Sequence, residues 1–403
     1  MRGAASVLEE CKKADYVSIH GLDGSLPPPP KGTHLEHYIT FWSTVLATRR
    51  ALVCVCRSWW QIATPFLYSS ICVHYKTIQG HSRKVYQRLT QFPHIRQHVA
   101  RWTFAIAIPA DQCSRVIAMC GNITSLTVPM NLDWEVLISE GPGVSTLPHL
   151  RVLRVAVTEW PAERKQYTQV VEFLGQQQQL EVLSLKAWDY LVDPIKCPAL
   201  RLPRLHSLEL IGMEGRPMYR WLQHSHFPSL RILSLPTINL DSASFLQNVG
   251  PTIEVLQLQK PHWHPYEASV LPTHYIHFPL LRHLTLYQHS NTSPPGTLPG
   301  LVALLNPAPP QLRTVVITAM ETLSAFARTF EFLELLAPKL PDEGASHWLR
   351  SLTQLRLVLP GRIPNVASVA LEAIRAYRMD CEAGAKRLGL ELEVMEPPNG
   401  SNT

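Results

Sequence analysis

One spacing of apolar and polar positions returns along most of the chain. It consists of an apolar residue, two others, an apolar residue, one other and a further apolar residue. The copies begin at Tyr68, Val99, Ile123, Leu150, Leu180, Leu205, Leu230, Ile253, Leu281, Leu312 and Leu352. Ten intervals span 284 residues, so the copies recur about every 28 residues. The second half of each copy alternates at period two, which predicts a short strand with one buried face.

The segments between the copies predict helices. Residues 111–121 and 241–250 each begin with an aspartate, a good N-cap, and end with a glycine, a common C-terminal stop. A longer helix is predicted over residues 365–389, from an asparagine cap to a glycine. Residues 390–394 then alternate as a last strand, with two glutamates facing solvent and discouraging further strand addition. The repeating unit is therefore strand, turn and helix.

This spacing resembles the L-x-x-L-x-L of a leucine-rich repeat. The resemblance implies an α/β fold in which residues 68–396 form a curved solenoid with a parallel sheet on its concave face. Strand positions between the apolar ones would point outward, and with the loop 259–278 they are the surface expected to bind a target protein. The target-binding residues predicted on this basis are Arg154, Lys186, Glu209, Gln257, His283, Tyr287 and Arg356. The alternative is an ordinary solvated face, and the mixed signs argue against one dominant electrostatic partner.

Ahead of the repeats, residues 51–71 form a second kind of pattern. At helical period one stripe is apolar, comprising Leu52, Val55, Trp59, Ile62 and Phe66. The proline at position 65 cannot continue that helix, so it is expected to open a second short helix. The stripe either packs against the first repeat or is offered to another protein.

Residues 52–71 resemble the second half of an F-box, whose pattern is roughly L-V-C-R-x-W followed by a short helix and an L-Y element. The matching residues are Leu52, Val55, Cys56, Arg57, Trp59, Leu67 and Tyr68. Residues 88–104 resemble the segment that joins an F-box to leucine-rich repeats in a large group of fungal proteins. The family's opening Leu-Pro is present as Leu26 and Pro27, but three more prolines follow. Because such a run forbids a helix, the first helix must begin near Thr33.

This resemblance implies a substrate-receptor subunit of a ubiquitin ligase. The box would bind a Skp-type adaptor, and through it a cullin, while the repeats would hold an unknown protein substrate. The adaptor-binding residues are then Leu26, Pro27, Leu52, Val55, Cys56, Trp59 and Ile62. The implied domains are a disordered segment 1–25, the box 26–67, the solenoid 68–396 and a disordered tail 397–403. The alternative is a leucine-rich-repeat scaffold with a vestigial box and no ligase role.

Composition and charge narrow the possible classes of protein and of partner. The chain of 403 residues is 46% hydrophobic and 17% charged, which is typical of an ordered protein. Its net charge of +6 is mild over this length and no five basic residues run together, so nucleic acid is not an expected partner. No signal-like or membrane-length apolar run is found, so we expect no membrane association and a cytoplasmic or nuclear location.

Motifs for catalysis and metal binding were sought in the same sequence. The chain has no P-loop, no G-x-S-x-G, no H-E-x-x-H and no G-x-G-x-x-G, so we expect neither an enzyme nor a cofactor. Residues 259–278 are rich in histidine, but no H-x-x-x-H pair has an acidic third ligand, so no metal site is expected. The eight cysteines form no C-x-x-C pair and are expected to be reduced.

Overall fold

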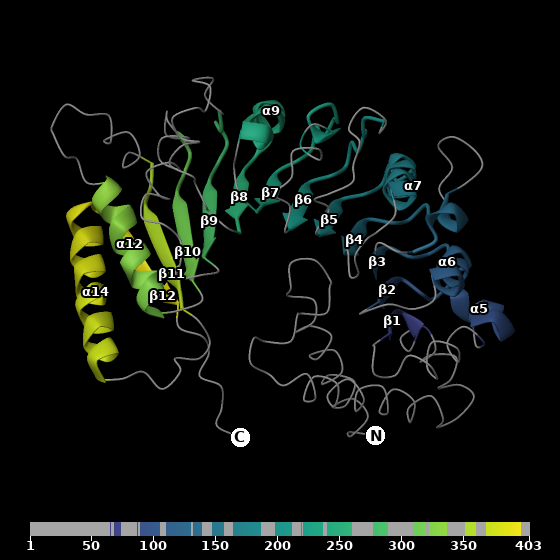
Figure 1. Cartoon of the computed structure of the whole chain (residues 1–403), viewed down its shortest axis with the longest axis horizontal. Helices are drawn as coiled ribbons and strands as arrows, with labels where there is room; N and C mark the ends of the chain where they lie inside the picture. The colour runs from purple at the N-terminus through teal and green to yellow at the C-terminus, as the bar shows by residue number, and fades with distance from the viewer. Residues whose placement is uncertain are drawn as a thin grey trace, which may run out of the picture. The chain divides into compact units, whose positions relative to one another are not determined.

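The computed structural model describes part of the chain (Figure 1). The described residues are 65, 68–73, 87, 89–104, 110–129, 132–138, 147–156, 164–186, 198–211, 219, 221–236, 240–259, 277–288, 309–319, 322–336, 351–359 and 368–395. The predicted disordered segments and the box, apart from the helical Pro65, lie outside these residues. The chain divides into two compact units, Met1–Leu183 and Ser184–Thr403, which are taken in turn.

Four parallel strands in chain order organise the first unit. They are β1 (Ser70–Val73), β2 (Arg101–Phe104), β3 (Ser125–Pro129) and β4 (Val152–Ala156). The helices among its described residues are α5 (Pro93–Arg96), α6 (Ala110–Ala118), the 3-10 turn η2 (Trp134–Leu137) and α7 (Arg164–Gly175). Strand β5 (Val182–Lys186) spans the boundary between the units.

The segment that joins the predicted box to the repeats is described from residue 89 onward. It contains α5 and leads directly into β2. Leu89, Ile95 and Val99 are buried along it. Arg96 donates a hydrogen bond of 2.6 Å from Nε to the carbonyl oxygen of Leu89, which ties the helix back to the preceding turn. This segment is thus a packed part of the first unit.

The second unit repeats the same arrangement over seven parallel strands in chain order. They are β6 (Ser207–Ile211), β7 (Ile232–Leu235), β8 (Val255–Leu258), β9 (His283–Gln288), β10 (Thr314–Ala319), β11 (Gln354–Val358) and β12 (Glu391–Met395). The helical elements whose bounds are described are α9 (Leu240–Val249), the 3-10 turn η3 (Gly250–Thr252), α12 (Thr322–Leu336) and α14 (Ser368–Arg387). Helix α12 packs against α14, β10 and β11, and α14 packs against β12 (Figure 1). The predicted α/β class, with parallel strands and intervening helices in a solenoid-like order, is confirmed.

The three apolar positions of each repeat form the core. From the copy at Val99 onward, every described side chain at the first, fourth and sixth positions is at most 3% exposed. Across the second unit the fourth positions stand directly opposite one another, in the order Leu208, Leu233, Leu256, Leu284, Val315, Leu355 and Leu392. Each fully buried leucine contributes about 1.5–3 kcal/mol. The repeat spacing therefore identified the core correctly.

The predicted helix boundaries are close to those observed. Helices α6 and α9 each begin one residue before the predicted start, and β12 is shifted by one residue from the predicted strand. Gly389, the predicted stop after α14, has φ of 69°, a left-handed conformation that favours glycine. Glu393 in β12, expected to face solvent, is 42% exposed and also forms an ion pair with Arg356 that the sequence analysis did not predict.

Gly250 has a steric role beyond ending α9. A Cβ atom at this position would lie 2.8 Å from the carbonyl oxygen of His277. That oxygen belongs to the backbone, so the chain itself would have to move. We predict that Gly250→Ala lowers the free energy of unfolding by about 1–3 kcal/mol in chemical denaturation. Gly121→Ala is the matched control, since a Cβ there meets nothing within 4 Å; equal losses in both variants would contradict the steric explanation.

Leu233 tests the core assignment. It is fully buried in β7 between Leu208 and Leu256. We predict that Leu233→Ala lowers the free energy of unfolding by about 2–5 kcal/mol, because the repeat cannot collapse around the cavity. Ser244→Ala, on the exposed side of α9, should change it by less than about 0.5 kcal/mol. A loss below about 1 kcal/mol for Leu233→Ala would show that this copy is not core.

Candidate functional site

The outward side chains of the second unit form a row across its sheet, here called the central row. It follows the fifth repeat position and consists of Glu209, Ser234, Gln257, Thr285, Val316, Arg356 and Glu393, each directly opposite the next. The residues before and after each member from Glu209 to Arg356 are buried in the core, so the central row lies on the opposite face. With strands about 4.8 Å apart, the row is about 29 Å long.

Five of the seven predicted target-binding residues share this face. Glu209, Gln257 and Arg356 belong to the central row. His283 and Tyr287 lie two residues before and two residues after Thr285 in β9, so both are on the same face. The structure thus brings these five residues onto one sheet surface, as the repeat pattern predicted.

The other two predicted residues lie on strands outside β6–β12. Arg154 is on β4 of the first unit, opposite Thr127, and its side chain is half-buried. Lys186 is the last residue of β5. Most of the loop 259–278, also predicted to touch a target, lies outside the described residues, and so do all seven predicted adaptor-binding residues.

The residues in the middle of the central row are uncharged, and the residues at its two ends are charged. Ser234 is buried, and its hydroxyl oxygen accepts a hydrogen bond of 3.1 Å from Nε2 of Gln259. At the β12 end, Arg356 Nε lies 2.8 Å from Glu393 Oε2, and both side chains are just over 40% exposed. Gln354 also donates to that carboxylate at 3.2 Å. An ion pair this exposed contributes up to about 1 kcal/mol, so it orders the surface more than it stabilises the fold.

The pKa values of Tyr287 and His283, whose rings lie on this face, are both shifted. Burial raises the pKa of Tyr287 and the negative charge of Glu209 raises it further, so the phenol stays protonated and can donate a hydrogen bond at neutral pH. Burial lowers the pKa of His283, and the positive charges of Arg356, Arg282 and Arg313 lower it further. His283 is therefore a neutral imidazole at pH 7, able to both donate and accept.

A second row lies where the strands begin, here called the strand-start row. It follows the second repeat position and consists of His206, Arg231, Glu254, Arg282, Arg313 and Thr353. Each backbone amide donates to the carbonyl of the preceding member, at distances of 2.8–3.0 Å. Sequence analysis did not single out this row, although the signal was present: arginine or glutamate fills the second position in six of the repeats from Leu150 to Leu312.

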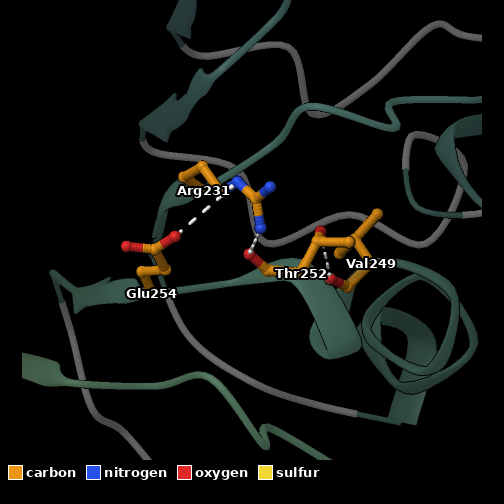
Figure 2. A network of polar contacts seen from close by, with 4 residues as sticks. All are labelled: Arg231, Val249, Thr252 and Glu254. Carbon is orange, nitrogen blue, oxygen red and sulfur yellow. Dashed lines mark hydrogen bonds and ion pairs between the residues drawn. The ribbon is translucent and has the colours of Figure 1, made fainter.

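Figure 2 shows the contacts of one member of the strand-start row. Arg231 Nε lies 3.7 Å from Glu254 Oε1, and its terminal nitrogen donates to the carbonyl oxygen of Thr252 at 3.4 Å. The hydroxyl of Thr252 donates to the carbonyl oxygen of Val249 at 2.9 Å. Arg231 thereby links two neighbouring strands to the turn after α9, which is a structural task.

Comparison with known proteins assigns the chain to no family. No protein-family model matches the chain, and no curated protein sequence is significantly similar to it. Among the described residues, no three histidine, cysteine, aspartate or glutamate side chains are grouped so as to hold a metal ion. In the same part of the chain no helix has both the length and the apolar character needed to cross a membrane.

The environment of His283 can be tested directly. We predict that its imidazole titrates below the ordinary histidine pKa, and that Arg356→Gln shifts the titration upward by removing a nearby positive charge. The measurement is a pH series of histidine ring resonances by NMR, with the His283 signal assigned by a His283→Gln variant. Arg204→Gln, in the exposed turn before β6, is the control and should leave the His283 signal unmoved. A His283 pKa at or above the ordinary value would contradict the packing described.

Proposed function

We propose that this chain is the substrate-receptor subunit of a Skp/cullin-type ubiquitin ligase. In this proposal residues 26–67 bind the adaptor and the repeat sheet binds the protein to be modified. The receptor performs no chemistry of its own and needs no cofactor. It works in the cytoplasm or the nucleus, where its partners would be found.

The observation that carries the target-binding half of the proposal is the uniform outward face of the second unit. The apolar repeat positions form the core, and the positions between them form a mostly polar row about 29 Å long, in which Ser234 and Thr285 are buried. A row of this length is longer than a small-molecule pocket and is long enough to contact a segment of another protein. The residues on it are fixed by the backbone register, so they are already arranged before a target arrives.

The adaptor-binding half is supported by the F-box resemblance of residues 52–71. Its stripe contains Trp59, the largest apolar side chain there, with Val55 one turn before it. Buried tryptophans are frequent anchors of interfaces, and truncating one typically costs about 2 kcal/mol or more in binding. Trp59 is therefore the residue we expect to contribute most to adaptor binding.

A second candidate function is a leucine-rich-repeat interaction scaffold without a ligase role. It is favoured by one observation, the run of prolines 27–30 where an F-box begins its first helix. In this case the stripe of residues 52–66 packs against the first repeat, and the outward face of the sheet still binds a protein. The two candidates therefore differ only in what the stripe contacts.

The stripe can be tested with a pull-down of a Skp-type adaptor. We predict that the unmodified chain captures the adaptor and that Trp59→Ala and Val55→Asp each weaken capture about tenfold or more. Gln61→Ala, which the sequence pattern places on the side of the predicted helix turned away from the stripe, should leave capture intact. Thermal unfolding is followed in parallel, and the receptor proposal requires nearly unchanged melting temperatures. No capture by the unmodified chain, with melting lowered by several degrees in both stripe variants, would favour the scaffold instead.

A further inference from the structure

The strand-start row carries an arrangement of charge that the proposed function has not used. At two places neighbouring members of the second repeat position are opposite in sign and form an ion pair. Arg151 NH1 lies 3.5 Å from Glu181 Oε1, and Arg231 pairs with Glu254 as Figure 2 shows. In both pairs the arginine stands one repeat before the glutamate, so the pairing follows the repeat and neutralises the row.

Arg282 and Arg313 break this alternation. They occupy neighbouring places in the row, since the Arg313 amide donates to the Arg282 carbonyl at 3.0 Å. Both side chains are exposed, and within the described part of the chain neither guanidinium has an ion pair or a hydrogen bond. Like charges on adjacent strands destabilise a sheet, so this pair is not explained by folding. Glu254, the acidic neighbour on one side, is already paired with Arg231.

His283 lies beside the same two arginines. It follows Arg282 in the chain, it is the first residue of β9, and it stands directly opposite Thr314, the residue after Arg313. Both arginines also depress the pKa of its ring. Two exposed arginines and one neutral histidine are therefore neighbours at the start of β9 and β10.

We propose that Arg282, Arg313 and His283 form a docking site for an acidic segment of a target protein. Each guanidinium presents a planar fork of donors that fits one carboxylate with two hydrogen bonds, and the imidazole can donate a further one. Two carboxylates would give Arg282 and Arg313 the kind of partner that Arg231 has in Glu254. The inference rests on the proposed function, because it names the chemistry of the target that the repeat sheet binds.

The surroundings favour an acidic peptide over a nucleic acid. A nucleic-acid interface needs a long basic track that contacts many phosphates. Here the basic site is short. It is bounded by Glu254 just before β8, by the neutral Thr353 before β11 and by Glu391 on β12. A duplex lying across these strands would bring its phosphates against carboxylates on either side of the two arginines.

The test measures binding of the full chain to a fluorescent tetra-glutamate peptide flanked by glycine and serine, by fluorescence anisotropy at low salt. We expect saturable binding that weakens as salt is raised, and no binding of the matching tetra-glutamine peptide. The double variant Arg282→Gln/Arg313→Gln should weaken binding about tenfold or more. Its melting temperature should be unchanged or raised, since a like-charge pair has been removed.

The charge-matched control is Arg204→Gln/Arg375→Gln, which removes two exposed arginines from a turn and from α14. It should bind the peptide as the unmodified chain does. An equal loss in the control, or no binding by the unmodified chain, would overturn the inference. So would tighter binding of an oligothymidylate that depends on Arg282 and Arg313. Adaptor capture by the double variant is read separately: if capture is intact while the peptide fails to bind any form, only the docking site is refuted.

Discussion

The in-register parallel hydrogen-bond ladder is the constraint on which the other features of the second unit depend. It sets each fourth-position side chain directly opposite its counterparts, so that Leu208, Leu233 and Leu256 pack in a continuous line. The same register places every fifth-position side chain in line on the other face. Core and surface are therefore two results of one backbone pattern, and a register slip of one residue would exchange them.

The fold could be predicted from sequence to the extent that burial follows periodicity. The apolar positions of each repeat are nearly always buried, and the glycine after α14 has the left-handed backbone expected of a stop. Periodicity could not show which polar side chains of different repeats contact one another. The pair between Arg356 and Glu393 joins residues far apart in sequence, and only the alignment of β11 with β12 brings them within 2.8 Å.

The face of the sheet that carries the candidate site was predicted, but its side-chain contacts were not. Choosing outward strand positions placed Glu209, Gln257 and Arg356 on one face, because the alternation of a strand decides the face. It did not identify Arg282 and Arg313, because the second repeat position precedes the strand. The alternation of a strand therefore does not decide which face a residue at this position occupies. Comparing the second positions of successive repeats would have found them. The adaptor-binding residues depend on a family resemblance rather than on periodicity, and they lie outside the described part of the chain.

The uniform register of β6 to β11 also makes the central row a measure of length. Glu209 and Arg356 are separated by a whole number of strand spacings, five in this chain. Gain or loss of one repeat between them would change their separation by about 4.8 Å without altering any side chain. A related chain could therefore adapt to a longer or shorter charged motif by repeat number alone, while keeping the chemistry of both ends.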